Sequence, residues 1–252
     1  MMFIRSKLIG FGHCLPAKIL TNDDLSHMVE TSDEWIRSRT GIRSRHIAET
    51  ETTSVIAGQA VANAINDAGL KPEDVDLLIL ASITPDNTTP STAVKIAGNL
   101  GFRSGVPAFD ISAACSGFVY ALTLADNMIR LGQVKTAVIA GAECLSKIVD
   151  WQDRNTCVLF GDGAGAVVLQ AEAGTGQSSD IGVLSTHIYA DGAQYDYLKT
   201  TSPLKPSNFP LPSRIIIVRH SVYVLEPSSV PNNGCLWNFH LIAIILFCQC
   251  KI

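Results

Sequence analysis

The sequence lacks a long hydrophobic run. The longest uninterrupted apolar stretch is 241–248, eight residues, in a chain of 252. A membrane-spanning helix needs about 20 apolar residues, so the sequence predicts no membrane span. The stretch that follows Arg5 and Lys7 is short and interrupted by glycine, unlike the apolar region of a secretory signal. We therefore expect a cytoplasmic protein.

Charge is also scarce and unclustered. Charged residues make up 17% of the chain and the net charge is −4. Nucleic-acid binding needs clustered lysine and arginine, so we expect no nucleic-acid partner. The seven cysteines form no Cys-x-x-Cys pair, and Cys248 and Cys250 are too close together for an ordinary zinc pair. We expect reduced thiols, no metal and no cofactor.

The composition changes near Ser202. Residues 203–252 contain five charged side chains and six prolines, with no helical period and no capping signals. The abrupt change favours a truncated or frameshifted reading of a longer gene. The alternative is a genuine divergent C-terminus. In both cases we expect a poorly ordered tail.

Before this break, strand and helix patterns alternate. This order favours an α/β fold with a largely parallel central sheet. Strands are expected at 3–12, 75–82, 106–111, 136–141 and 181–189, with a strand-like stretch around a glycine-rich turn at 158–170. Helices are expected at 53–68, 91–100 and 118–131, and a short one opened by a capping box between Thr31 and Glu34.

Cys115 lies where a predicted buried strand turns into a helix. Small residues on both sides would allow a sharp turn and the approach of a substrate. A helix N-terminus favours the thiolate and lowers the thiol pKa, and its amides can hold an oxyanion. This arrangement suits acyl transfer through a thioester. The alternative is a small buried hydrophobe, which is also our interpretation of Cys144 and Cys157.

Several segments resemble β-ketoacyl-acyl-carrier-protein synthase III, a thiolase-fold condensing enzyme. The similarity covers roughly residues 3–200. It implies a complete first half at 1–172 with helices covering the sheet, the start of the second half at 173–202, and an unmatched tail at 203–252, so that the second half is mostly missing. The matching segments are Thr-Ser-Asp-Glu-Trp-Ile at 31–36, Arg-Thr-Gly-Ile-Arg at 39–43, Arg-His-Ile-Ala at 45–48, residues 110–120 around Cys115, Asp153-Arg154, and Phe-Gly-Asp-Gly-Ala-Gly-Ala at 160–166.

The resemblance implies the first condensation of fatty-acid synthesis. An acyl group would move from coenzyme A to Cys115, and decarboxylated malonyl-acyl-carrier protein would attack the thioester. By motif, Trp35 would stack on the adenine of coenzyme A with Arg154 on its other side, while Thr31 and Arg39 would contact the same nucleotide. Alternatively, Trp35 is a helix anchor and the arginines at 39–45 form a solvated face. A homodimer is expected for the family.

Two further segments carry expectations. The family often has an aromatic residue where Thr89 stands, reaching across the dimer to limit the acyl pocket. Thr89 therefore favours longer or branched primers. Residues 161–166 superficially resemble a dinucleotide fingerprint, which we interpret as a glycine turn near the active site.

The family's other catalytic motifs are missing from this sequence. Neither the His-Gln-Ala-Asn motif nor a Gly-Asn-Thr-Ser-like motif occurs, and His187 matches neither. Losing one oxyanion donor costs roughly 10²–10³ in rate. We therefore expect weak or absent labelling of Cys115 by acetyl-coenzyme A and no condensation. The alternative is a non-catalytic remnant that binds at most coenzyme A or a partner. The segment with Trp35 and Arg39 disfavours a polyketide or hydroxymethylglutaryl synthase.

Overall fold

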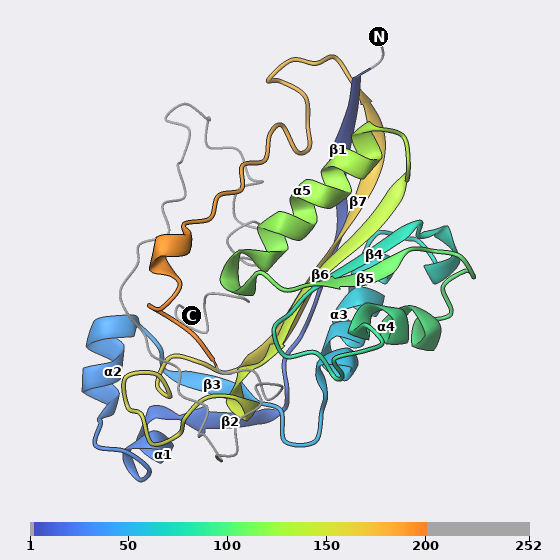
Figure 1. Cartoon of the computed structure of the whole chain (residues 1–252). Coiled ribbons are helices and arrows are strands. Elements are labelled where there is room, and N and C mark those ends of the chain that lie inside the picture. Colours follow the sequence, from blue (N-terminus) through green and yellow to red (C-terminus); the bar gives the residue numbers. More distant parts are fainter. Residues whose placement is uncertain (1–2, 201–252) are drawn as a thin grey trace.

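A computed structural model describes residues 3–200. Its centre is a five-stranded sheet in the order β1-β7-β6-β4-β5 (Figure 1). The pairs β6–β4 and β4–β5 are parallel, and β7 is antiparallel to both β1 and β6. Four strands therefore run in one direction and β7 alone runs against them, which confirms the expected largely parallel sheet. The strands are β1 (Phe3–Cys14), β4 (Leu77–Ala81), β5 (Ala108–Ile111), β6 (Thr136–Cys144) and β7 (Asp162–Gly174).

Helices cover both faces of this sheet. α3 (Thr53–Asp67) and α4 (Thr92–Leu100) lie on one face and α5 (Gly117–Arg130) lies on the other (Figure 1). Each face has its own apolar cluster. The five residues of β4 are all buried, as expected of a strand covered on both faces. Gly69 and Gly101, which follow α3 and α4, have positive φ angles of 68° and 75°, a conformation in which glycine commonly ends a helix.

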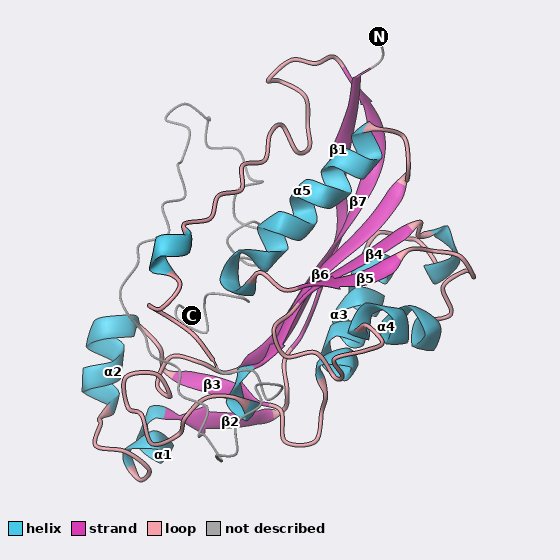
Figure 2. Ribbon diagram, viewed as in Figure 1, coloured by secondary structure: helices cyan, strands magenta, loops and turns pink. Residues whose placement is uncertain are grey.

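A smaller layer packs beside one end of the sheet. It contains the antiparallel pair β2 (Lys18–Thr21) and β3 (Ser44–Ile47) with the helices α1 (Asn22–Ser26) and α2 (Asp33–Thr40) (Figure 2). A third apolar cluster joins this layer to the segment before β7. Short 3₁₀ turns occupy Pro72–Asp74, Ala114–Ser116, Leu145–Lys147 and Gly192–Gln194.

The predicted capping box at Thr31 is wrong by one residue. The hydroxyl of Ser32, not Thr31, caps α2 and accepts a hydrogen bond from the backbone N–H of Trp35. A cap hydroxyl satisfies the amide three residues later, and Ser32 has the extended backbone of an N-cap residue. A reciprocal capping box does occur at α1, between Thr21 and Asp24.

Two other expectations were also wrong. Most of residues 161–166 belong to β7, where Gly163 and Gly165 pair with Glu143 and Gly141 of β6. Small residues there permit close packing within a strand and do not form a turn. Residues 181–189 form no strand. They lie alongside α5 instead, and the Tyr120 hydroxyl of that helix donates to the carbonyl of Tyr189. The expected tail at 203–252 lies outside the described residues.

Candidate active site

The turn between β5 and α5 presents Cys115. The residue lies in the 3₁₀ turn Ala114–Ser116, immediately before the first residue of α5, and is exposed. Ala114 has φ 45°, the one positive φ among the non-glycine residues that the structure describes. Such a conformation costs a side-chain-bearing residue about 1–2 kcal/mol. Strain of this kind is concentrated at functional sites, and here it sets the direction of the cysteine.

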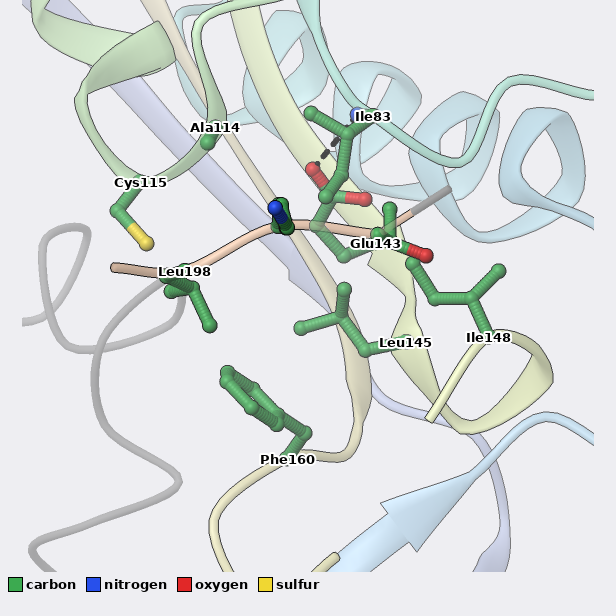
Figure 3. A pocket seen from close by; sticks show the side chains of 10 residues that line it. Ile83, Ala114, Cys115, Glu143, Leu145, Ile148, Phe160 and Leu198 are labelled. Carbon is green, nitrogen blue, oxygen red and sulfur yellow. Dashed lines mark hydrogen bonds between the residues drawn. The ribbon is translucent and has the colours of Figure 1, made fainter. Parts of the chain in front are cut away.

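A cavity of about 120 Å³ opens beside Cys115. Its walls are mainly apolar, and Figure 3 shows the sulfur at one side with Leu198 and Phe160 nearby. No histidine belongs to this lining among residues 3–200. The lining residues are Ile83, Ala114, Cys115, Glu143, Leu145, Ile148, Phe160, Leu198, Lys199 and Thr200.

The thiol pKa does not follow the sequence-based expectation. Loss of solvation raises the pKa of Cys115 above its ordinary value, and the negative charge of Glu143 raises it further. The expected lowering required a dominant effect of the helix N-terminus or a nearby cation. The surroundings of Cys115 instead combine an apolar wall with a carboxylate. The free thiol is therefore a weak nucleophile that is well placed.

Glu143 was missed by sequence reasoning. It lies near the end of β6, and its carboxylate accepts hydrogen bonds from the backbone N–H of Ile83 (2.9 Å) and the hydroxyl of Thr84 (2.6 Å). Desolvation raises the pKa of its carboxyl to about 7, against the opposing effect of these hydrogen bonds. The available signal was an acidic residue directly after an apolar strand, at the sheet edge where Cys115 was expected.

Three of the four residues expected to bind a nucleotide, Trp35, Arg39 and Arg154, lie together around the Trp35 ring. The guanidinium carbons of Arg39 and Arg154 lie 4.6 and 4.5 Å from the centre of the Trp35 ring. Arg154 therefore contacts Trp35 directly, without the intervening space that a stacked base needs. Thr31 Oγ1 and Arg154 Nε are buried and have no hydrogen-bond partner within residues 3–200. Of these two atoms, Arg154 Nε belongs to the guanidinium that lies over the Trp35 ring. An orphaned donor beside an aromatic ring is suited to a polar, planar ligand.

The remaining predicted residues have distinct positions. Thr89 is exposed, in the loop between β4 and α4, and does not line the cavity of this single chain. Arg45 is fully buried and donates to the carbonyl of Val158, so the proposal of a solvated face fails for this residue. Cys144 and Cys157 are buried with raised pKa values, which confirms their interpretation as inert packing.

Within residues 3–200, no helix is both long and apolar enough to cross a membrane. Over the same range, no group of three or more histidine, cysteine, aspartate or glutamate residues is arranged to hold a metal ion.

Known proteins are similar to this chain in sequence and in fold. Residues 109–192 match the 3-oxoacyl-[acyl-carrier-protein] synthase III family. A β-ketoacyl-[acyl-carrier-protein] synthase III of Paramagnetospirillum magneticum is 57% identical over 198 residues, 78% of this chain and 61% of that protein. The synthase III crystal structure from Aquifex aeolicus is 50% identical (TM-score 0.72), covering 77% of this chain and 61% of that one. The one from Pseudomonas aeruginosa is 40% identical (TM-score 0.73), covering 79% and 61%.

The fold and the cysteine at the β5–α5 turn therefore define a thiolase-like α/β protein. Within that class, the chain belongs to the β-ketoacyl-acyl-carrier-protein synthase III family. It spans about 61% of the length of the relatives that it matches.

Proposed function

We propose that the protein is an acyltransferase of the synthase III type and that Cys115 accepts the acyl group of an acyl-coenzyme A. The single observation that carries the proposal is the position of Cys115, at the start of α5 and beside an apolar cavity of about 120 Å³. The family's reaction, priming fatty-acid synthesis with malonyl-acyl-carrier protein as second substrate, supplies the context. The protein would act in the cytoplasm as a homodimer.

The residues around Cys115 suit the first half of this reaction. The thiolate attacks the thioester carbonyl, and the coenzyme A thiolate leaves as the new thioester forms. The N-terminus of α5 directly follows the turn that carries Cys115, and its backbone amides are proposed to stabilise negative charge on the carbonyl oxygen. The raised pKa of Cys115 leaves little thiolate at neutral pH, so the transfer should be slow.

The cluster of Trp35, Arg39 and Arg154 is proposed to hold the nucleotide of coenzyme A. Because Arg154 contacts the Trp35 ring in the free protein, an adenine that stacks on that face would displace the guanidinium. The released arginine could then cover the outer face of the base or pair with a phosphate. Thr31 Oγ1 supplies a further buried hydrogen-bonding group.

The acyl chain is proposed to occupy the apolar cavity between Phe160 and Leu198. Thr89 would face the cavity of the partner copy in a dimer, where its small side chain leaves more room than an aromatic residue. The protein would then accept longer or branched primers as well as acetyl groups.

The test is transfer of radiolabelled acetyl from acetyl-coenzyme A to the purified protein. We expect slow incorporation into the wild type and none into Cys115→Ser, with Cys14→Ser as the matched control because Cys14 is a partly buried free cysteine outside the cavity. Equal incorporation into wild type and Cys115→Ser would refute the proposal.

A further inference from the structure

Among residues 3–200, Glu143 is the one acidic side chain in the lining of the Cys115 cavity. The residue is partly buried, and its carboxylate accepts three hydrogen bonds from the chain just after β4. The donors are the hydroxyl of Ser82, the backbone N–H of Ile83 and the hydroxyl of Thr84. In Figure 3 the carboxyl group lies against Ile83. The carboxylate thus has a fixed position on the cavity wall.

In the described part of the chain, no cation pairs with this carboxylate. Lys199 also lines the cavity, but its ammonium group donates to Asp196 Oδ1 at 2.6 Å. The other lining residues are apolar or carry no charge, apart from the Cys115 thiol itself. A second negative charge in this space would meet an unneutralised carboxylate in a poorly solvated site, where like charges repel strongly.

We infer that Glu143 is a specificity-determining residue that excludes acyl groups ending in a carboxylate from Cys115. Acyl chains without a charge, straight or branched, meet only the apolar wall. A malonyl or succinyl group loaded on Cys115 would keep its carboxylate in the same cavity, whereas malonyl-acyl-carrier protein loses its carboxylate as carbon dioxide in the proposed condensation. The part of this inference that concerns acyl substrates rests on the proposed function. The charge selection itself is independent of that function, because it acts on any reagent that reaches the sulfur.

Two alkylating reagents isolate this effect. Iodoacetamide and iodoacetate modify the same thiolate and differ in that iodoacetate carries a carboxylate. The ratio of their rates at Cys115 is therefore independent of how much thiolate is present. The modified peptide that contains Cys115 is quantified by mass spectrometry, and N-acetylcysteine gives the intrinsic ratio. Repulsion between two unit charges about 8–12 Å apart, at an effective dielectric constant of about 20, slows the charged reagent by roughly ten- to thirtyfold.

At pH 8.5 we expect the wild type to favour iodoacetamide about tenfold more than N-acetylcysteine does. Glu143→Gln should bring the ratio down to that of N-acetylcysteine. Ser82→Ala, which removes the weakest donor at 3.4 Å but keeps the charge, should retain the wild-type ratio. An unchanged ratio in Glu143→Gln would overturn the inference.

The wild type alone provides a second test if Glu143→Gln does not fold. Because desolvation raises the pKa of Glu143 to about 7, the ratio should rise as the pH increases from 6 to 8.5. The ionisable groups near Glu143 are the thiols of Cys115 and Cys144 and the ammonium group of Lys199, which pairs with Asp196. Lys199→Met should leave this rise in place. A wild-type ratio that equals the ratio for N-acetylcysteine at pH 8.5 would contradict the inference. If acetyl transfer is absent but the ratio of the iodoacetamide and iodoacetate rates changes as expected, the proposed function is refuted and the charge selection stands.

Discussion

At the scale of single residues, the thiol of Cys115 is placed by its backbone while its neighbours suppress its ionisation. Ala114 holds a left-handed conformation directly before it, and α5 begins two residues later. The apolar wall and Glu143 both raise the pKa of the thiol. Position and charge therefore act in opposite directions at this residue. A further group near the sulfur would have to supply the missing activation.

Trp35 provides a test of the nucleotide site. Replacing an aromatic residue that stacks on a base costs about 1–3 kcal/mol of binding free energy. We expect Trp35→Ala to weaken coenzyme A binding by about fivefold or more in isothermal titration calorimetry. Trp151→Phe is the matched control, since Trp151 packs in the same cluster and donates to the carbonyl of Ser146. Equal affinities of wild type and Trp35→Ala would remove the stacking role.

At the scale of elements, Asp86 fixes the loop between β4 and α4. Its carboxylate accepts from the backbone N–H of Ser54 (2.9 Å) and from Lys95 Nζ (2.7 Å). This loop carries Ile83 to the cavity and Thr89 to the surface. Desolvation opposes ionisation of Asp86, but the hydrogen bonds outweigh it and lower the pKa to about 2.

The Asp86 carboxylate should therefore stabilise the fold in a pH-dependent way. Its folded pKa lies below the unfolded value, so the stabilisation is fully present above pH ~4 and is lost as the pH falls through about 2. We expect Asp86→Asn to lower the free energy of unfolding by about 2 kcal/mol at pH 7. The difference from wild type should shrink between pH 4 and pH 2 in urea titrations. A difference that persists at pH 2 would mean that the charge is not the cause.

The contact between β1 and α3 depends on glycine. A Cβ atom on Gly12 would overlap the backbone of Ala60 and Ala64 in α3. We expect Gly12→Ala to destabilise the protein by about 3 kcal/mol or more, or to prevent folding. Gly98 in α4 has open space around it, so Gly98→Ala should be neutral or stabilising by up to about 1 kcal/mol. Similar midpoints for the two variants in thermal unfolding would contradict the packing described.

At the scale of the whole molecule, alternation of strand and helix patterns was sufficient to predict the layered α/β fold and the position of Cys115. Local pattern could not show that residues 161–166 lie in β7, because paired glycines in a strand look like a turn when their partner strand is unknown. It also could not show that residues 181–189 form a loop packed alongside α5, because an apolar stretch is compatible with both a strand and a packed loop. Glu143 was missed because its importance comes from a loop about 60 residues away in sequence.

The cavity combines a cysteine with apolar walls, and no histidine lines it among residues 3–200. Acyl loading and condensation should therefore separate in this chain. Loading needs Cys115, the amides of α5 and the Trp35 cluster, all of which are described. Polarising a malonyl thioester needs further donors, which the described cavity does not provide.

Peptide mass spectrometry after incubation with acetyl-coenzyme A, before and after a chase with malonyl-acyl-carrier protein, tests this account most directly. We expect acetyl on the peptide that contains Cys115, and we expect it to persist through the chase. Acetyl found equally on other cysteine peptides would contradict Cys115 as the acceptor. Loss of acetyl with formation of a 3-oxoacyl product would contradict the separation of loading from condensation.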